Sequence, residues 1–123
     1  MAEPPKISVY GVRLADLSLT QGKAILALRI ENPNPYSIPL RGLNYNLLLN
    51  NIKVAEGDVQ KNLTITGHED RIIEVPVNIQ FASLLQTLPG LVKTRKFTYD
   101  LSGNTQFPFL SIPFKRIGRV GAY

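Results

Sequence analysis

Residues 24–31 read AILALRIE, and their side chains alternate between a purely apolar set and a mixed set. The apolar set consists of Ala24, Leu26, Leu28 and Ile30. The intervening positions end in Arg29 and Glu31. Because successive side chains of a β-strand point to opposite faces, this stretch predicts a strand with one face in a core and the other in water.

The same period of two recurs further along the chain, in residues 43–50, 73–79 and 97–102. Each of these stretches is expected to be a half-buried strand. Pro76 and Pro113 fall within strand patterns, and proline cannot donate a backbone hydrogen bond. Their strands are therefore expected at sheet edges or at bulges.

Local turn signals separate the strands. The stretch 7–14 changes phase at Gly11, which predicts a β-bulge that turns the later side chains back toward the core. Asn50 and Asn51 lie between two strand-like runs and tolerate positive φ, so a tight hairpin is expected there. The polar residues 66–70 predict the next turn.

One segment departs from the strand period. Phe81, Leu84, Leu85 and Leu88 have helical spacing, which predicts a short helix at 81–88 that stops at Pro89-Gly90. Taken together, the patterns predict an all-β fold: an antiparallel immunoglobulin- or fibronectin III-like β-sandwich of about seven strands with one short helix. A barrel is the alternative that the patterns leave open.

The composition indicates one folded domain. The chain has 123 residues, 44% of them hydrophobic, and no cysteine. That hydrophobic content is too high for a disordered chain, and the lack of cysteine excludes disulfides, thiol nucleophiles and Cys-ligated zinc. No apolar run is long enough for a membrane-spanning helix. We expect a disordered N-terminal tail at 1–6, one domain at 7–118 and a C-terminal tail at 119–123.

Positive charge is concentrated at the end of the chain. Residues 1–92 contain eight basic and eight acidic side chains, whereas residues 93–123 contain six basic side chains and one acid. The asymmetry can mark an anionic partner such as a membrane surface, and no motif for nucleic acid accompanies it. The favoured, simpler interpretation is a solvated edge strand and tail. The candidate patch comprises Lys93, Arg95, Lys96, Lys115, Arg116 and Arg119.

Residues 29–43 form a proline-rich connection between two predicted strands. Each proline fixes its own φ and pushes the preceding residue out of the helical region. Asn32 and Asn34 can bond nearby backbone groups through their side chains. We favour a loop-shaping role for Asn32-Pro33-Asn34, with a binding loop as the alternative.

The order of motifs after this connection carries a family resemblance. Asn32-Pro33-Asn34 is followed by an aromatic residue, by Ile38-Pro39-Leu40 and by a Leu-x-Tyr strand. Residues 47–57, Tyr99–Gly103 and Ile112–Phe114 continue the pattern. The chain thus resembles, over about residues 7–118, the water-stress and hypersensitive-response (WHy) domain of the folded, atypical group 2 late embryogenesis abundant proteins, and a bacterial member in particular.

The resemblance implies a fold and a role. The fold is an antiparallel β-sandwich with one short helix. The role is protection of other proteins during desiccation or cold, by a monomer with no enzymatic activity and no cofactor, and its partners are client proteins bound weakly and without specificity. Bacterial members often carry a secretory or lipoprotein signal, so the cell envelope is the favoured location and the cytoplasm is the alternative.

The residues offer no credible catalytic group. His68 is the sole histidine and neighbours Glu69 and Asp70, but adjacent residues on an extended chain point apart, whereas catalytic groups must converge. We expect a solvated turn there. Residues 107–110 read FPFL, which is apolar on both faces and fits either a buried strand or an exposed patch for partners.

Two functions follow from these observations. The first is a non-enzymatic protein that protects or weakly binds clients under stress. The second is an envelope- or membrane-associated binding module that uses the basic C-terminal quarter on anionic lipid. Catalytic, cofactor-binding and metal-binding residues are not expected.

Overall fold

The computed structural model describes residues 3–15, 21–80 and 96–121, and these residues form seven β-strands. Every pairing between the strands is antiparallel. The all-β prediction is therefore confirmed. The strands are β1 (Lys6–Ala15), β2 (Gln21–Glu31), β3 (Ile38–Leu49), β4 (Ile52–Ile65), β5 (Asp70–Gln80), β6 (Lys96–Phe107) and β7 (Leu110–Gly121).

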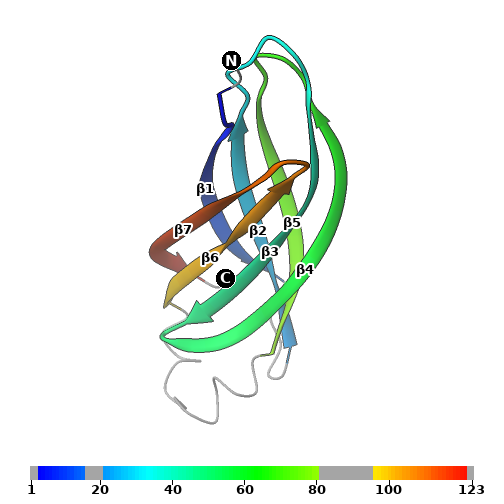
Figure 1. The fold of residues 1–123 in the computed structure, drawn as a ribbon. Coiled ribbons are helices and arrows are strands. Elements are labelled where there is room, and N and C mark those ends of the chain that lie inside the picture. The colour runs from blue at the N-terminus through cyan, green and yellow to red at the C-terminus, as the bar shows by residue number, and fades with distance from the viewer. Residues whose placement is uncertain (1–2, 16–20, 81–95, 122–123) are drawn as a thin grey trace.

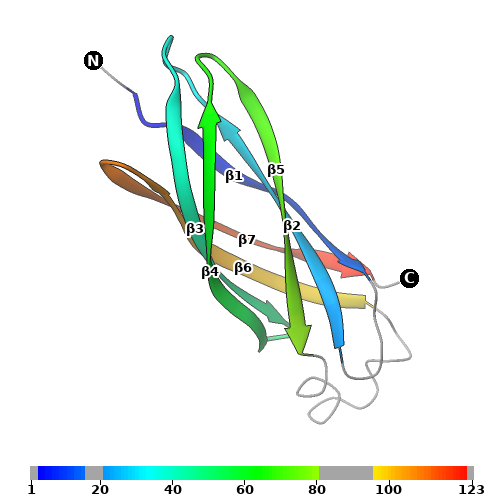
Figure 2. The ribbon, with the colours of Figure 1, turned by 90° about the vertical axis from the view of Figure 1, so that its right-hand side faces the viewer.

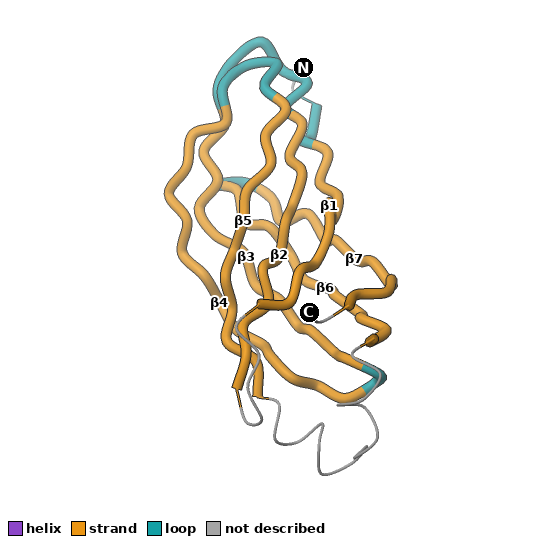
Figure 3. The backbone as a smooth tube through the Cα atoms, turned by 180° about the vertical axis from the view of Figure 1, so that it is seen from behind, coloured by secondary structure: helices purple, strands orange, loops and turns teal. Residues whose placement is uncertain are grey.

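The strands make two layers. One sheet has the order β1-β2-β5 and the other has the order β4-β3-β6-β7 (Figures 1 and 2). The chain passes from one sheet to the other at the β2–β3, β4–β5 and β5–β6 connections. The first two of these connections lie at the same end of the molecule as the N-terminus (Figure 3). Within the described ranges there is no helix long and apolar enough to cross a membrane.

The inward faces of both sheets share one hydrophobic core. The alternation in residues 24–31 is seen as predicted, because Leu26 and Leu28 are buried while Arg29 is exposed. The opposite sheet contributes Leu43, Leu47, Leu49, Leu101 and Phe114 among others. Burial of these side chains is the main favourable term that holds the two layers together.

The phase change in β1 is a bulge, as its sequence predicts. Val9 pairs with Leu28 and Gly11 pairs with Ala27, which leaves Tyr10 as the extra residue. Val9 lies in the core before the bulge, and Val12 packs against the core after it. The bulge thus keeps the apolar side of β1 facing inward along its whole length.

The β3–β4 connection is the predicted tight hairpin. Asn50 and Asn51 have φ values of 49° and 66°, in the left-handed region that asparagine tolerates. Asn50 also fixes the start of β6: its backbone N–H donates to the carbonyl of Thr98 at 2.7 Å, and its Oδ1 accepts from the N–H of Thr98 at 2.8 Å. The turn and the neighbouring strand are therefore locked in register.

On the inner face of the pair β6–β7, each of two aromatic rings lies over a glycine on the neighbouring strand. Phe114 pairs with Gly103, and Tyr99 pairs with Gly118. A Cβ atom on Gly103 would stand 2.0 Å from the carbonyl oxygen of Asn44, and one on Gly118 would stand 2.6 Å from the Tyr99 ring. Only glycine permits this close approach of strand and ring.

The sheets extend beyond the predicted limits of the domain. β7 continues to Gly121, so residues 119–121 belong to a strand and not to a tail. β1 begins at Lys6, and Glu3 is bonded to Asn34, so the described residues 3–6 are ordered against the sheets. Both corrections have one cause: backbone hydrogen bonds to distant residues hold these ends, and local sequence does not reveal them.

The prolines lie where their chemistry predicts. Pro76 is in β5 and Pro113 is in β7, and each of these strands is an edge of its sheet. An edge position spares proline from donating to a ladder on its outer side. The predicted helix at 81–88 lies outside the described residues.

Candidate functional site

The amide of Asn32 holds together two loops at one end of the molecule. Asn32 is 2% exposed. Its Nδ2 donates to the carbonyl oxygens of Tyr36 at 2.9 Å, Thr66 at 3.0 Å and Ile65 at 3.2 Å. One side chain therefore joins the connection after β2 to the end of β4.

Asn34 extends this network to the N-terminus. Asn34 is 3% exposed, and its backbone N–H and its Nδ2 donate to Asn32 Oδ1 at 3.0 and 3.1 Å. Its side chain also forms a reciprocal pair with Glu3: Nδ2 donates to the Glu3 carbonyl at 2.7 Å, and Oδ1 accepts from the Glu3 N–H at 2.9 Å. We call Asn32, Asn34 and the backbone groups that they bind the Asn corner. Its geometry supports the loop-shaping role that the sequence favours.

The turn after β4 closes the Asn corner. His68 has a φ of 58° and its backbone N–H donates to the carbonyl of Asn34 at 2.9 Å. Glu69 accepts from the N–H of Thr66 through Oε1 at 3.0 Å, and its carbonyl accepts from the N–H of Asn32 at 2.9 Å. His68 is exposed, as expected of a solvated turn. Glu69 thus stabilises the turn through hydrogen bonds to the backbone, and nothing in this turn points to catalysis.

An apolar hollow lies beside the Asn corner. It encloses about 490 Å³ and combines three segments that are distant in sequence. These are the N-terminal residues 3–5, the connection 36–39 and the β6–β7 hairpin 107–110. We call this space the apolar hollow. Two of its walls are positioned by the Asn corner, since Asn34 binds Glu3 and Asn32 binds Tyr36.

The FPFL segment divides between core and solvent. Phe107 is buried in the core, whereas Phe109 at the tip of the hairpin is 98% exposed. Leu110 and Tyr36 are also largely exposed beside it. Of the two interpretations that the sequence left open, the exposed patch applies to Phe109 and the buried strand applies to Phe107.

The predicted basic patch is divided by the structure. Lys115 and Arg119 are exposed at alternate positions of β7 and lie opposite Ser102 and Thr98 of β6. Lys96 is exposed at the start of β6, and with Arg119 it lines a shallow hollow. We call Lys96, Lys115 and Arg119, with Ile117 between the last two, the cationic face. Lys93 and Arg95 lie outside the described residues.

Arg116 does not belong to this face. It shares its parity with the buried Phe114 and Val120, and its guanidinium reaches β1 of the other sheet. There Nη1 donates to the carbonyls of Val9 at 3.0 Å and Tyr10 at 3.1 Å, at the bulge. Arg116 is exposed, and its guanidinium bridges the two sheets, whereas no such bond to a described residue holds Lys115 or Arg119. The parity along β7 is the signal in the sequence that separates Arg116 from its neighbours.

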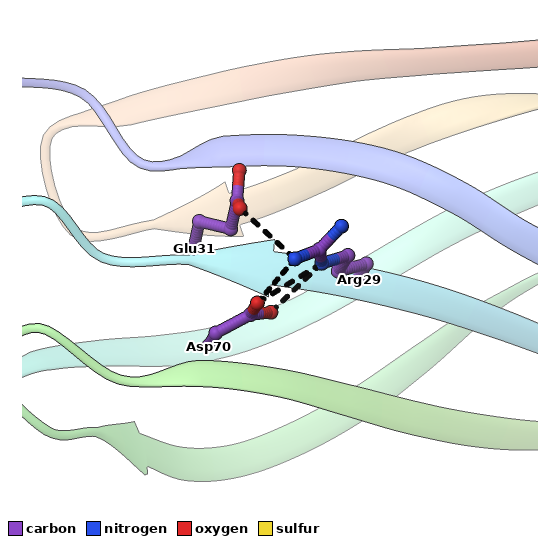
Figure 4. A network of polar contacts seen from close by, with 3 residues as sticks. All are labelled: Arg29, Glu31 and Asp70. Atoms are coloured by element: carbon purple, nitrogen blue, oxygen red, sulfur yellow. Dashed lines mark hydrogen bonds and ion pairs between the residues drawn. The ribbon is translucent and has the colours of Figure 1, made fainter.

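An ion-pair network that the sequence analysis missed lies on the outer face of the first sheet. Arg29 of β2 binds Asp70 of β5 through two guanidinium nitrogens, with Nε at 2.9 and 3.1 Å from the carboxylate oxygens, and lies 3.3 Å from Glu31 (Figure 4). The hydrogen bond from Arg29 lowers the pKa of the Asp70 carboxyl, and the same bond raises the pKa of Arg29. These groups are exposed, so the network adds little to stability.

The described residues offer no site for a metal ion. No group of three or more histidine, aspartate or glutamate side chains converges within residues 3–15, 21–80 and 96–121. Arg13 is paired with Glu74, and Lys53 is paired with Glu56. Glu74 and Glu56 are therefore paired with basic side chains of the protein.

Solved structures of other proteins share this fold. The solution structure of AT1g01470 from Arabidopsis thaliana is 16% identical, with a TM-score of 0.80 over 99% of this chain and 84% of that one. A putative late embryogenesis abundant protein, At2g46140.1, is 20% identical, with a TM-score of 0.74 over 97% and 71%. A protein from Archaeoglobus fulgidus is 13% identical, with a TM-score of 0.66 over 100% and 98%. At these identities the likeness concerns the fold alone.

The family is shown by the sequence itself. No curated protein matches the chain. The model of the family described as late embryogenesis abundant protein matches residues 27–118, which include Asn32, Asn34 and nearly all of the sheet of β4, β3, β6 and β7. This protein therefore belongs to the late embryogenesis abundant protein family.

Proposed function

We propose that this protein protects other proteins from inactivation during water stress, without catalysis, by weak contact with partly unfolded clients. The observation that carries the proposal is the apolar hollow beside the Asn corner. Membership of the late embryogenesis abundant family supports a role in stress. Exposed apolar surface next to a rigid scaffold is a common feature of protein-binding sites.

The strength of such contacts suits a reversible protector. Burial of one large apolar side chain of a client contributes about 2–3 kcal/mol, and ordering costs offset part of it. Affinities in the millimolar range correspond to about 4 kcal/mol, so contacts of this kind are transient at ordinary concentrations. Drying or freezing concentrates both proteins and thereby raises occupancy. Clients are then kept apart while water is scarce and are released when it returns.

The rigidity of the hollow follows from the Asn corner. Pro4, Pro5 and Pro39 line the hollow, and proline has little conformational freedom to lose on binding. Asn34 holds the N-terminal wall and Asn32 holds the wall at Tyr36. In this proposal the Asn-Pro-Asn motif has a structural role that serves binding indirectly.

The test is recovery of a labile enzyme after repeated freeze–thaw cycles in the presence of the protein. The wild type should protect better than albumin at equal mass. The double variant Y36S/L110S removes two exposed apolar side chains from the hollow and should protect less. The control is I72S, because Ile72 is 45% exposed on the outer face of β5, away from the hollow. Equal protection by Y36S/L110S and I72S would contradict the proposal.

We also propose a narrower classification. The run from Asn32-Pro33-Asn34 through Ile38-Pro39-Leu40 supports placing the chain in the WHy branch of the family. The strand order supports a fibronectin III-like sandwich, because β4 pairs with β3. In immunoglobulin constant domains the fourth strand belongs instead to the sheet of the first, second and fifth strands. An experimental structure with β4 paired to β5 would contradict the fold assignment.

A further inference from the structure

The outward side chains of β7 place one exposed apolar residue, Ile117, between two basic ones, Lys115 and Arg119. The odd-numbered residues face away from the core, since the even-numbered Phe114 and Val120 are buried. The outward row includes Ile117, which is 62% exposed, and the turn that precedes β7 presents Phe109, which is 98% exposed. Lys115 and Arg119 flank Ile117 in the same row.

The cations of this row have no anionic partner among the described residues. Asp100 is the acid of β6 that lies opposite Ile117, yet no ion pair joins it to Lys115 or Arg119. By contrast, Arg13 and Arg29 on the outer face of the first sheet are both paired with carboxylates. The row therefore presents positive charge to whatever lies outside β7.

From these observations we propose that the outer row of β7 docks on an anionic lipid bilayer, with Phe109 and Ile117 inserted among the headgroups and Lys115, Arg119 and Lys96 bound to lipid phosphates. β7 is the edge strand of its sheet and pairs with β6 alone among the described strands (Figure 1), and Lys115, Ile117 and Arg119 are exposed along it. Long basic side chains flanking apolar ones suit the bilayer interface, where the stems contact acyl chains and the charges contact headgroups.

The exposed apolar side chains near the cations favour a bilayer over an acidic protein. An acidic protein needs only the cations, whereas a bilayer also removes Phe109 and Ile117 from water. Ten residues of strand span about 33 Å, which sets the length of the surface from Phe109 to Arg119 that a bilayer would contact. Arg116 takes no part, because its guanidinium is bonded to Val9 and Tyr10 of the other sheet. The proposal goes beyond client protection and does not depend on it.

The first experiment is co-sedimentation with vesicles of phosphatidylcholine and phosphatidylserine, against vesicles of phosphatidylcholine alone. Binding is expected with the anionic vesicles, and it should weaken as salt rises. Each cation at such a surface raises affinity about fivefold, so K115Q/R119Q should bind about thirtyfold less well. The matched control R13Q/K23Q removes two charges from exposed positions of the first sheet and should bind almost as well as the wild type.

The second experiment reports insertion. The chain contains no tryptophan, so F109W and I117W each place a single reporter at one point of the row. Their emission should shift to the blue when anionic vesicles are added. I72W, at a position that is 45% exposed on the opposite sheet, should not shift.

Three outcomes would overturn the proposal. One is no binding to anionic vesicles at low salt, and another is an equal loss of binding in K115Q/R119Q and R13Q/K23Q. The third is binding to soluble polyglutamate that K115Q/R119Q abolishes, with no blue shift of F109W or I117W on vesicles, which would indicate an acidic protein partner. None of these outcomes affects freeze–thaw protection, which Y36S/L110S tests at different residues.

Discussion

The Asn corner and the cationic face are both polar, but the polar atoms of the corner are buried and hydrogen-bonded, whereas those of the face are exposed to water. In the corner, the amide groups of Asn32 and Asn34 all have hydrogen-bond partners and are almost wholly buried. On the face, Lys115 and Arg119 are exposed and form no ion pair with the described residues. A buried polar atom without a partner is costly, whereas a hydrated cation is not. The corner therefore stabilises the fold, and the face is available for binding.

The sharpest way to break this comparison is to remove the amide of Asn32. N32A leaves three carbonyl oxygens without their donor, those of Tyr36, Ile65 and Thr66. The expected loss is about 3 kcal/mol of unfolding free energy, or about 10 °C in Tm. Urea unfolding followed by circular dichroism measures it. The control N62A removes an exposed amide from β4 and should change the free energy by less than about 0.5 kcal/mol.

Arg116 tests whether hydrogen bonds or exposure decides the role of a cation, because it is exposed and yet bonded to β1. R116M keeps the packing of the stem but leaves the carbonyls of Val9 and Tyr10 without a protein donor. Water can reach part of this site, so the expected loss is about 1–2 kcal/mol. K115M changes the neighbouring, outward residue and should cost less than about 0.5 kcal/mol. Equal effects in thermal melts of the two variants would mean that Arg116 belongs to the cationic face after all.

The pair of Arg29 and Asp70 lies between the two extremes, because it is partnered but exposed. The pKa of Asp70 is lowered in the folded protein, so its contribution to stability is present above the unfolded pKa of about 4 and is lost as pH falls through the folded pKa. D70N should therefore cost little at neutral pH, because the pair is exposed, and nothing at acidic pH. Urea unfolding across pH and salt measures this, with D58N as an exposed control. A cost that persists in acid would contradict the assignment.

The smallest effect on stability is expected on the cationic face itself. K115Q/R119Q removes two charges that have no partner in the described part of the chain, so the unfolding free energy should change by less than about 0.5 kcal/mol. Any change should be a small gain in stability, because the loss of two positive charges relieves repulsion in a chain with net charge +5. The same variant should lose most of its vesicle binding. A large loss of stability would show that the face is structural.

Much of the fold is predictable because its causes are local. Alternation along residues 24–31 predicts which side chains are buried, since the side-chain period of a strand is two. The bulge in β1 is visible because its apolar side chains change phase at Gly11, and the hairpin at Asn50-Asn51 is visible because asparagine tolerates positive φ. The Asn32-Pro33-Asn34 motif marks the Asn corner but does not reveal its partners.

Sequence by itself determined the strand patterns, the turns, the family and the excess of positive charge near the C-terminus. Tertiary structure alone decided which of those charges bind other parts of the chain, because Arg116 donates hydrogen bonds to β1 while Lys115 and Arg119 do not. It also brought residues 3–5, 36–39 and 107–110 together around the apolar hollow. The physical reason is the same in both cases. Strand periodicity and turn conformation depend on neighbours in the chain, whereas these contacts depend on how two sheets are stacked.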